Sequence, residues 1–467
     1  MHRVPRYRRQ GWHKWLVGAL VLAFGWLIYS NWPLWRGFSP QDLVENSELK
    51  AKSLTLPVKE VEFAGGQLKA YMLEDNSNPI ISLNFRFRNA GYASDNEHEQ
   101  GIAQMAAALL TEGAGSYSEQ ELKEELAARA IKVSFAAEKD DFSGSVLTTK
   151  ANADKAAELL RLMLTEPRFA EPDIKRVKLQ MQEALKRQNE HPAKILERKF
   201  AQELYNQHPY GRNPLGRKED IARLTRKDLQ KFVRDNFSRN NLLVGVAGDV
   251  NPAEAELWLN KIFGTLPTSG QINFVREAEP KFDGRTRRVE RESGQNIFLG
   301  ALSGVGRNHE DFYPLFVANY IWGGAGLTSR LSQQIREKNG LTYGIYSYLG
   351  IDDKSPLLLV SYAATADKFA MAEKLLDEEL GRIQKQGISA TELDKAKNYL
   401  IASYNLRFAS IENIAEILTA MQKYNLGLDF LQKRNDYIAS LSLERVNAVA
   451  KKYFDKDQMV RVEIGKF

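Results

Sequence analysis

Two stretches of this 467-residue chain follow the same pattern, and this repetition constrains the fold more than any other feature. Residues 224–250 (LTRKDLQKFVRDNFSRNNLLVGVAGDV) and 441–467 (LSLERVNAVAKKYFDKDQMVRVEIGKF) each start with a capping residue, continue as an amphipathic run and end in an apolar segment. This order predicts a capped helix that leads into a strand. The matched positions, separated by 217 residues in both cases, are Asn236-Phe237 with Tyr453-Phe454, and Gly248 with Gly465.

Two further pairs of segments extend the repeat. KANADKAAELL at 150–160 matches ATADKFAMAEKLL at 364–376, and the predicted long helix at 172–189 matches another at 390–404. Three matches in the same order argue for an internal duplication. Strands and helices are mixed irregularly and do not alternate strictly, so we expect an α+β fold of two duplicated halves, each a sheet packed with helices.

The repeat also predicts the domain boundaries. We expect a first half at 56–264 and a second half at 288–467, joined by a linker at 265–287. The linker prediction rests on its helix- and strand-breaking residues, which are Pro267, Gly270, Pro280 and Gly284. A cleft between two such halves is a natural place for a substrate.

Net charge is confined to the start of the chain. Residues 1–36 contain six Lys or Arg and no acidic residue, so the remainder carries 65 − 6 = 59 basic against 59 acidic residues. The net charge of +6 therefore belongs to that first segment. A nucleic-acid partner is not predicted, because the rest of the chain is formally neutral. The absence of cysteine excludes disulfides and thiolate metal sites.

Residues 15–35 form an uncharged run of 21 residues, and a bilayer core needs about 20 apolar residues in a helix. We predict a membrane anchor at 1–36 followed by a polar spacer at 37–55. The basic cluster before the run favours an inner-membrane protein with its N-terminus inside and its globular part periplasmic. A cleaved signal peptide is the alternative, although Ser30-Asn31-Trp32-Pro33 offers no small-x-small cleavage site.

Residues 327–349 (LTSRLSQQIREKNGLTYGIYSYL) are predicted to be a helix that stops and becomes a strand. Leu331 and Ile335 lie one turn apart on an apolar face. Asn339-Gly340 is a helix stop, because glycine adopts the left-handed conformation without a Cβ penalty. From Thr342 onwards apolar and polar positions alternate as in a strand.

This helix–strand segment places a cation and a phenol near each other. Arg336 falls in the last helical turn and Tyr343 early in the strand, so the two side chains are expected to project into one space. A Gly-rich turn precedes the helix, and its backbone is a candidate substrate-contacting element; its glycines are Gly323, Gly324 and Gly326. Taken alone, the pair fits a structural role better, with Arg336 a helix C-terminal charge and Tyr343 a strand aromatic.

Long ordered stretches of the chain resemble the pitrilysin/insulinase-type zinc peptidases, the inverzincins. The stretches are HPYGRNPLGRKEDIARLT (208–225), NNLLVGVAGDV (240–250) and YIWGGAGLTSRLSQQIREKNGLTYGIYS (320–347). The resemblance covers nearly everything after the predicted anchor. It implies an H-x-x-E-H motif on a helix, in which two histidines hold zinc and the glutamate activates water.

The zinc motif of this family is missing. In GIAQMAAALLTEGAG (101–115) the first histidine becomes Gln104, the glutamate becomes Ala107 and the second histidine becomes Ala108. Methyl groups cannot bind zinc or move protons, and a neutral amide is a poor ligand. Glu183 falls where the resemblance places the third ligand, but one carboxylate does not hold a catalytic zinc. We therefore predict no metal on this chain.

Other candidate sites in the sequence are weaker. The resemblance places a substrate-pairing edge strand near Phe135, and the phenylalanine there puts that role in doubt. His98 lies in an acidic loop, but no second histidine has ligand spacing, so a solvated loop is favoured. His208 and His191 are expected to be structural. No serine nucleophile elbow or phosphate loop is present in the sequence.

The family's R-x6-Y arrangement matches Arg336 and Tyr343. Because of this resemblance, we favour a functional role for the pair over the structural role that the two residues suggest when taken alone. The resemblance implies that the two residues assist a zinc site supplied by another chain, with Tyr343 donating to the oxyanion of the reaction and Arg336 orienting peptide carbonyls. We expect a non-zinc subunit of a heteromeric peptidase, whose homologous partner carries H-x-x-E-H and zinc. An inert scaffold of the same fold is the alternative, and a peptidase active alone would require stoichiometric zinc in the isolated protein.

Overall fold

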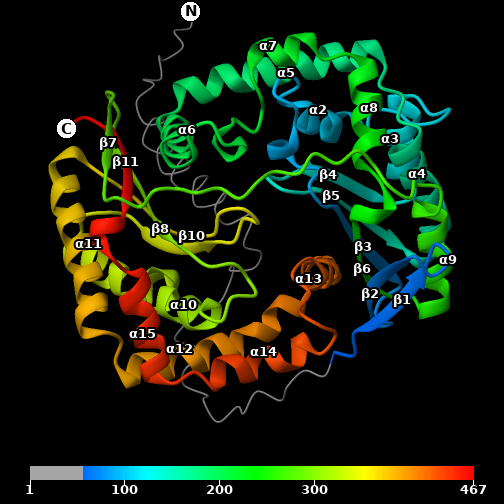
Figure 1. The fold of residues 1–467 in the computed structure, drawn as a ribbon. Coiled ribbons are helices and arrows are strands. Elements are labelled where there is room, and N and C mark those ends of the chain that lie inside the picture. The colour runs from blue at the N-terminus through cyan, green and yellow to red at the C-terminus, as the bar shows by residue number, and fades with distance from the viewer. Residues whose placement is uncertain (1–55) are drawn as a thin grey trace, which may run out of the picture. The chain divides into compact units, whose positions relative to one another are not determined.

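A six-stranded mixed sheet forms the centre of the first half (Figure 1), in a computed structural model that describes residues 56–467. Its strand order is β1-β2-β6-β3-β5-β4, so β1 and β4 are its edges. Strands β2 and β6 are parallel, and all other neighbours are antiparallel. The strands are β1 Lys59–Phe63, β2 Leu68–Glu74, β3 Ile80–Phe87, β4 Lys132–Ala137, β5 Phe142–Thr149 and β6 Leu242–Gly248.

Helices of the first half cover one face of this sheet. Helices α2, α4, α8 and α9 share a hydrophobic core with its strands, centred on Phe85, Phe87 and Phe142, which are fully buried. The helices are α2 Ile102–Leu109, α3 Glu119–Ala128, α4 Ala153–Thr165, α5 Glu171–Glu190, α6 Pro192–Tyr205, α7 Lys218–Arg223, α8 Arg226–Asn236 and α9 Pro252–Phe263. Short 3-10 turns lie at Tyr92–Ser94, Lys150–Asn152, Pro209–Gly211 and Arg239–Asn241.

The second half contains a five-stranded sheet with the same topology. Its order, β7-β11-β8-β10-β9, starts with a parallel pair and continues with antiparallel pairs, as β2-β6-β3-β5-β4 does in the first half. The strands are β7 Thr286–Glu290, β8 Asn296–Ser303, β9 Ile345–Gly350, β10 Leu357–Ala364 and β11 Val460–Gly465. The two sheets packed with helices confirm the predicted mixed architecture.

The helices of the second half follow the predicted repeat. Helix α8 and strand β6 correspond to α15 and β11, because α15 starts and ends 217 residues after α8. The helices are α10 Phe312–Asn319, α11 Ala366–Gln386, α12 Ala390–Ala402, α13 Ile411–Lys423, α14 Phe430–Ala439 and α15 Leu443–Tyr453. Irregular helical segments are η5 Tyr320–Gly324, η6 Gly326–Thr328, η7 Ser332–Lys338, η8 Ser403–Phe408 and η9 Lys456–Gln458.

The predicted anchor at 1–36 and spacer at 37–55 lie outside the described residues. Every helix within residues 56–467 is too short or too polar to cross a membrane. The described residues all belong to one compact unit. Between α9 and β7, residues 264–285 form neither helix nor strand, and most of the predicted linker lies in this segment.

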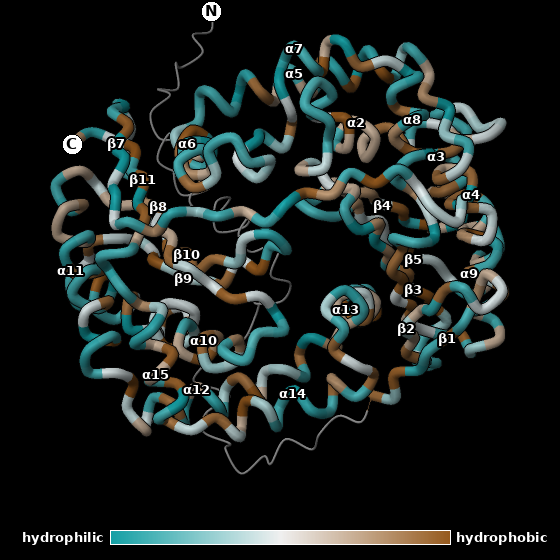
Figure 2. Tube along the Cα trace, in the orientation of Figure 1, coloured by the Kyte–Doolittle hydropathy of each residue, from teal (hydrophilic) through white to brown (hydrophobic). Residues whose placement is uncertain are grey.

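One helix of each half packs on the sheet of the other half. Helix α13 of the second half packs on the face of the first sheet that its own helices leave open, through Ala415 and Leu418 against Leu73 and Ala247. Helix α6 of the first half packs in the same way on strands β8 and β11. Figure 1 shows α13 beside β2, β3 and β6, and Figure 2 shows that hydrophobic residues line the strands. Each sheet therefore has one face covered by a helix from the other half.

Close backbone approach fixes α13 on the first sheet. A Cβ at Gly245 would lie 2.3 Å from the carbonyl oxygen of Ala415, so only glycine fits this position of β6. The Gln422 side chain contacts the backbone of the neighbouring Val244, whose N–H donates to Oε1 at 3.2 Å. Thr419 Oγ1 donates to the carbonyl oxygen of Asn84 on β3 at 3.2 Å.

The two edge-strand hairpins meet at their turns. The β4–β5 turn and the β9–β10 turn contribute facing polar groups, and Lys139 forms an ion pair with Asp352 across the junction. The N–H of Asp353 donates to Asp140 Oδ2 at 3.0 Å. Lys423, at the end of α13, lies 2.7 Å from Asp141 Oδ2 and 3.0 Å from Asp353 Oδ1. These polar contacts, in which Asp140 and Asp141 are buried and the other groups partly buried, hold the halves together at the free edges of the sheets.

Candidate functional site

Helix α2, where the resemblance places the zinc motif, is built as a packing helix. Gly101 caps it with φ +95°, and the carboxylate of Asp95 accepts from the Gly101 N–H at 2.8 Å and the Ala103 N–H at 3.4 Å. Burial raises the pKa of Asp95 to about 8. The apolar face of α2 is fully buried, and its residues are Ile102, Ala103, Met105, Ala106 and Leu109.

The three degenerate motif positions lie on the opposite face of α2. Gln104 and Ala107 are half-buried and Ala108 is exposed. Glu183 is exposed on α5, which packs against α2. This face therefore presents an amide, two methyl groups and one carboxylate, which is not a zinc ligand set. The absence of a catalytic metal at this face stays a prediction.

Gln104 instead caps a free strand edge. Its Nε2 donates to the carbonyl oxygen of Ala137 at 2.7 Å, and Ala137 ends the edge strand β4. The Glu138 N–H donates to the Asp141 carbonyl, and antiparallel alternation then turns the backbone groups of Ala137, Phe135 and Val133 to the open edge. Gln104 thus occupies the first carbonyl that an added strand would use.

Phe135 is a core side chain. Its ring lies 6.3 Å from that of Phe85 and 6.2 Å from that of Phe142, and it packs on the first hydrophobic core. Since the side chain points inward, the open backbone edge of β4 does not depend on which residue stands at 135. Strand β4 is an edge strand, and pairing with an extended peptide stays a prediction.

The segment that carries Arg336 differs in detail from the prediction. Leu331 and Ile335 are fully buried, and Gly340 ends the helix with φ +59°, as expected. However, Ser332–Lys338 is a π-helix, a rare form that is frequent at functional sites. The predicted strand begins later than expected, at Ile345, because Thr342 Oγ1 donates to the Ala363 carbonyl at 2.6 Å and ends the ladder there.

Arg336 and Tyr343 share one space. The guanidinium carbon of Arg336 lies 5.4 Å from the centre of the Tyr343 ring, and the ring is 65% exposed. Arg336 is half-buried, and its closest acidic group is Glu337, with Nη1 and Oε1 3.5 Å apart. A permanent cation and an exposed hydroxyl are thus presented together to solvent. Their catalytic role stays a prediction.

The candidate glycines before this segment differ from one another. Gly323 and Gly324 lie in a second π-helix, Tyr320–Gly324, and not in the predicted turn. Gly323 is buried, and a Cβ there would lie 2.3 Å from Ser347 Oγ, so packing requires this glycine. Gly326 has φ +56° and open space around it. Of the three, Gly326 presents the most accessible backbone, and substrate contact stays a prediction.

An ion pair that the sequence analysis missed anchors the Arg336 helix. Arg330 Nε and Nη2 each donate to the Glu392 carboxylate at 2.7 Å, and Nη2 also donates to the Gly387 carbonyl at 3.0 Å. The hydrogen bond from Arg330 lowers the pKa of Glu392 to about 2, and Ser389 adds to the effect. The signal in the sequence was the Ser389-x-x-Glu392 capping box at the start of α12.

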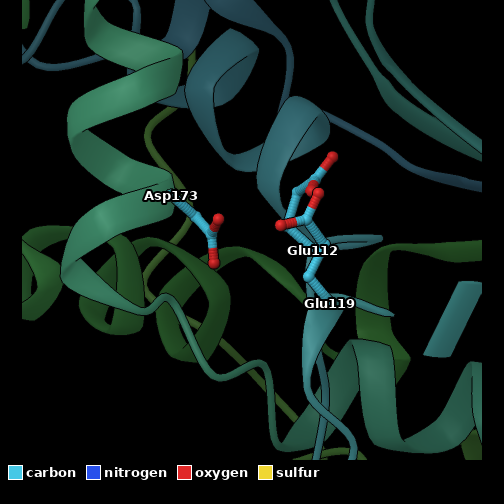
Figure 3. Close-up of side chains that lie close together, drawn as sticks. All are labelled: Glu112, Glu119 and Asp173. Atoms are coloured by element: carbon cyan, nitrogen blue, oxygen red, sulfur yellow. The ribbon is translucent and has the colours of Figure 1, made fainter. Parts of the chain in front are cut away.

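Three carboxylates outside α2 lie close enough to suggest a metal site (Figure 3). They are Glu112, Glu119 and Asp173. Lys123 lies 2.9 Å from Glu112 and 2.5 Å from Glu119, and Arg176 lies 2.8 Å from Glu112 and 3.0 Å from Asp173. Hydrogen bonding, first from Lys123, lowers the pKa of Glu119 to about 2. The two cations occupy the space between the carboxylates, which makes this group an ion-pair network.

His208, which the sequence predicts to be structural, has hydrogen-bond partners on both ring nitrogens. His208 Nδ1 accepts from the Tyr210 N–H at 3.2 Å, so Nε2 is the protonated nitrogen that donates to the Arg276 carbonyl at 2.9 Å. Burial lowers the pKa of His208, which favours the neutral ring. Within residues 56–467, His98 belongs to no cluster of possible metal ligands.

Two family models match most of the described chain. The model described as Insulinase (Peptidase family M16) matches residues 73–218, and the model described as Peptidase M16 inactive domain matches residues 223–400. The first match ends in α7, and the second covers α8, β6 and α9 of the first half together with the second half as far as α12. They agree with the resemblance that the sequence motifs indicate.

Bacterial relatives extend the similarity over both halves. The "Uncharacterized zinc protease YmxG" of Bacillus subtilis is 27% identical over 312 residues, which are 66% of this chain and 74% of the relative. The "Non-peptidase homolog YmxG" of Helicobacter pylori is 25% identical over 385 residues, 80% of this chain and 86% of the relative. The crystal structure of a peptidase M16 inactive domain from Pseudomonas fluorescens superposes with a TM-score of 0.82 at 27% identity, covering 88% of this chain and 98% of that one. The periplasmic protease PqqL of Escherichia coli shares the fold, with a TM-score of 0.75 at 16% identity over 88% of this chain and 46% of that one.

Proposed function

The chain belongs to the peptidase M16 family, and from that premise we propose that it is the non-zinc subunit of a heteromeric zinc metallopeptidase. A homologous partner contributes H-x-x-E-H, its zinc and the general base. This chain contributes Arg336 and Tyr343, together with half of the chamber that encloses the peptide. The observation that carries the proposal is the pairing of an exposed Arg336–Tyr343 site with an α2 that lacks metal ligands.

The chemistry of the pair suits the assistance of peptide hydrolysis. The partner's zinc supplies Lewis-acid activation of water. When water attacks the peptide carbonyl, the Tyr343 hydroxyl can donate to the oxygen that gains negative charge, and it is free to do so because its ring is exposed. Arg336 supplies a positive charge and planar donors for backbone carbonyls. Extended peptides small enough to be enclosed are the proposed substrates.

The first residues of the chain support a proposal for its location. We propose that the uncharged run at 15–35 anchors it in the inner membrane with the globular part in the periplasm, where the partner would also lie. The basic cluster that precedes this run supports the orientation. Membrane fractionation followed by protease treatment of intact and opened spheroplasts tests the proposal; degradation only after opening would contradict it.

The test of function is reconstitution of the full chain with a zinc-bearing homologue. A quenched peptide should be cleaved by the mixture and not by this chain alone. Tyr343→Phe and Arg336→Ala should each lower kcat/KM of the complex by roughly 10²- to 10³-fold, the usual effect of losing an oxyanion donor. Binding of the partner should stay unchanged, because both side chains are exposed or half-buried.

Matched controls separate a catalytic role from a structural one. Lys338→Ala removes another cation from the same helix, and Tyr437→Phe removes a hydroxyl from an exposed ring on α14. Both should leave kcat/KM within about twofold, as surface substitutions usually do. An inert scaffold, the alternative function, predicts that Arg336→Ala and Tyr343→Phe behave like these controls. Activity of this chain alone would also refute the proposal.

A further inference from the structure

Three arginines of the second half lie together without an acidic partner. They are Arg307, in the loop before α10; Arg407, in the 3-10 segment Ser403–Phe408; and Arg434, in α14. Within residues 56–467, no carboxylate oxygen lies within 4.0 Å of any of the three guanidinium groups. Asp429, which precedes the Phe430 that contacts Arg307, pairs instead with Lys433.

Arg434 is a buried cation. Its residue is only 7% exposed, and its guanidinium carbon lies 4.1 Å above the ring of Tyr404. Nη1 donates to the Leu400 carbonyl at 2.8 Å and to Asn435 Oδ1 at 2.9 Å, and within the described chain no acceptor is paired with Nε or Nη2. Burial lowers the pKa of Arg434 to about 10, which still leaves it charged at neutral pH.

Arg307 meets the same cluster through aromatic rings. Its guanidinium carbon lies 4.2 Å from the Phe312 ring centre, 4.9 Å from Tyr313 and 5.2 Å from Phe430. Nη2 donates to the Tyr313 hydroxyl oxygen at 2.9 Å, which leaves the Tyr313 proton available to another acceptor. Within the described residues, Nη2 is the only Arg307 nitrogen with a hydrogen-bond acceptor, so Nε and Nη1 have donors to spare.

Arg407 completes the group at the surface. It lies three residues after Tyr404 in the 3-10 segment, is exposed, and makes no hydrogen bond or ion pair to another described residue. Burial raises the pKa of Tyr404 and lowers that of Arg434, and the positive charges of Arg407 and Arg307 lower the pKa of both groups. The three cations thus run from the buried Arg434 through the half-buried Arg307 to the exposed Arg407.

The aromatic rings around Arg307 and Arg434 do not compensate for the positive charge of the three arginines. Cation–π contacts are worth less than the desolvation of a buried ion, and three like charges repel one another. A buried arginine ordinarily has a carboxylate or phosphate within reach, because its planar fork matches two oxygens of such a group. The cluster has cationic donors, phenolic hydroxyls and an exposed arginine at one end, and within residues 56–467 no carboxylate pairs with its three arginines.

We propose that Arg307, Arg407 and Arg434, with Tyr313 and Tyr404, form a binding site for a small oxyanion of the phosphate or carboxylate type. The ligand enters past Arg407 and is held at the buried end by Arg434. The site is separate from the Arg336–Tyr343 pair in sequence and is independent of the proposed peptidase role. It is built by three segments distant in sequence, so folding of the second half is required to form it.

Calorimetric titration of the purified full chain at constant ionic strength tests the site. Inorganic phosphate and citrate serve as the two probes, since they distinguish phosphate from carboxylate chemistry, and saturable binding of at least one is expected. Arg407→Ala should weaken that binding by roughly fivefold, the effect of one charge at about 4 Å in a watery environment. Arg226→Ala, which removes an exposed and unpaired arginine from the first half, is the matched control and should change nothing.

Thermal unfolding gives a second readout through Arg434. Arg434→Met removes the buried charge but keeps most of the side-chain volume, so it should abolish the rise in Tm that the bound probe produces. Binding of neither probe to the wild type refutes the site, as does an equal loss in Arg407→Ala and Arg226→Ala. A folded Arg434→Met variant that keeps the full anion-dependent rise in Tm also refutes it. If Arg434→Met does not fold, the Arg407→Ala titration alone decides.

Discussion

Lys423 at the end of α13 provides a quantitative test of how the halves are held together. Its side chain is 10% exposed and lies 2.7 Å from the fully buried carboxylate of Asp141. Lys423→Met keeps the aliphatic stem and removes the charge, so Asp141 loses its closest cation. Breaking a buried pair by removing one partner costs about 3–5 kcal/mol. Arg86, 3.9 Å from Asp141, still offsets part of that charge, so we expect about 3 kcal/mol.

The assay is equilibrium unfolding in urea, followed by far-UV circular dichroism and by tryptophan fluorescence. The midpoint should fall while the slope with urea stays constant, because the same surface is exposed on unfolding. Lys433→Met is the matched control, since Lys433 pairs with Asp429 on the surface of α14 and such pairs contribute at most about 1 kcal/mol. A loss below 1 kcal/mol for Lys423→Met, or an equal loss in both variants, would refute the reasoning.

The same variant predicts a pH dependence. Burial alone would lower the pKa of Lys423, but the charges of Asp141, Tyr424 and Asp353 outweigh burial and raise it above its ordinary value. A raised pKa in the folded state means that the stabilisation is fully present below the ordinary lysine pKa of about 10 and is lost as the pH rises beyond it. The difference between wild type and Lys423→Met should therefore be constant from about pH 6 to about pH 9 and shrink above that range.

Two further changes test the interface between the halves and the degenerate zinc site. Gly245→Ala should lower the free energy of unfolding by about 2–3 kcal/mol, because its Cβ would meet the Ala415 carbonyl, whereas Gly306→Ala, with open space around it, should stay within about 0.5 kcal/mol in the same urea assay. Rebuilding the motif with Gln104→His, Ala107→Glu and Ala108→His should create stoichiometric zinc binding in equilibrium dialysis, lost again on adding Glu183→Gln; a folded triple variant without zinc would contradict the assignment of these positions.

Local patterns in the sequence predicted the repeated elements well. The capped helix at 226–236 and the strand at 242–248 recur as α15 and β11, because caps, apolar spacing and β-rich runs are properties of neighbouring residues. The predicted helix at 172–189 appears as α5 with one more residue at each end. The predicted helix at 390–404 ends at Ala402 and continues as a 3-10 segment.

Pairing between distant segments could not be predicted from the sequence. The apolar face of α13, with Ile414 and Leu418, predicts that this face is buried. It does not predict which of the two sheets the helix packs on. The π-helix around Arg336 was missed because Leu331 and Ile335 have the spacing of an α-helix. The arginines of the proposed anion site are likewise distant in sequence, and their lack of acidic partners appears only once the chain is folded.

The position of the degenerate motif on α2 explains how the fold exists without a metal. Ile102, Met105 and Leu109, with Ala103 and Ala106 between them, form the buried face that packs α2 on the core of the first half. Gln104 and Ala108 lie on the other face, where their side chains contribute little to that core. Residues on this face can therefore change from zinc ligands to an amide and a methyl group without creating a cavity or burying a charge. Because the core packing and the degenerate motif use different faces of one helix, a chain of this family can lack the metal ligands and keep its fold.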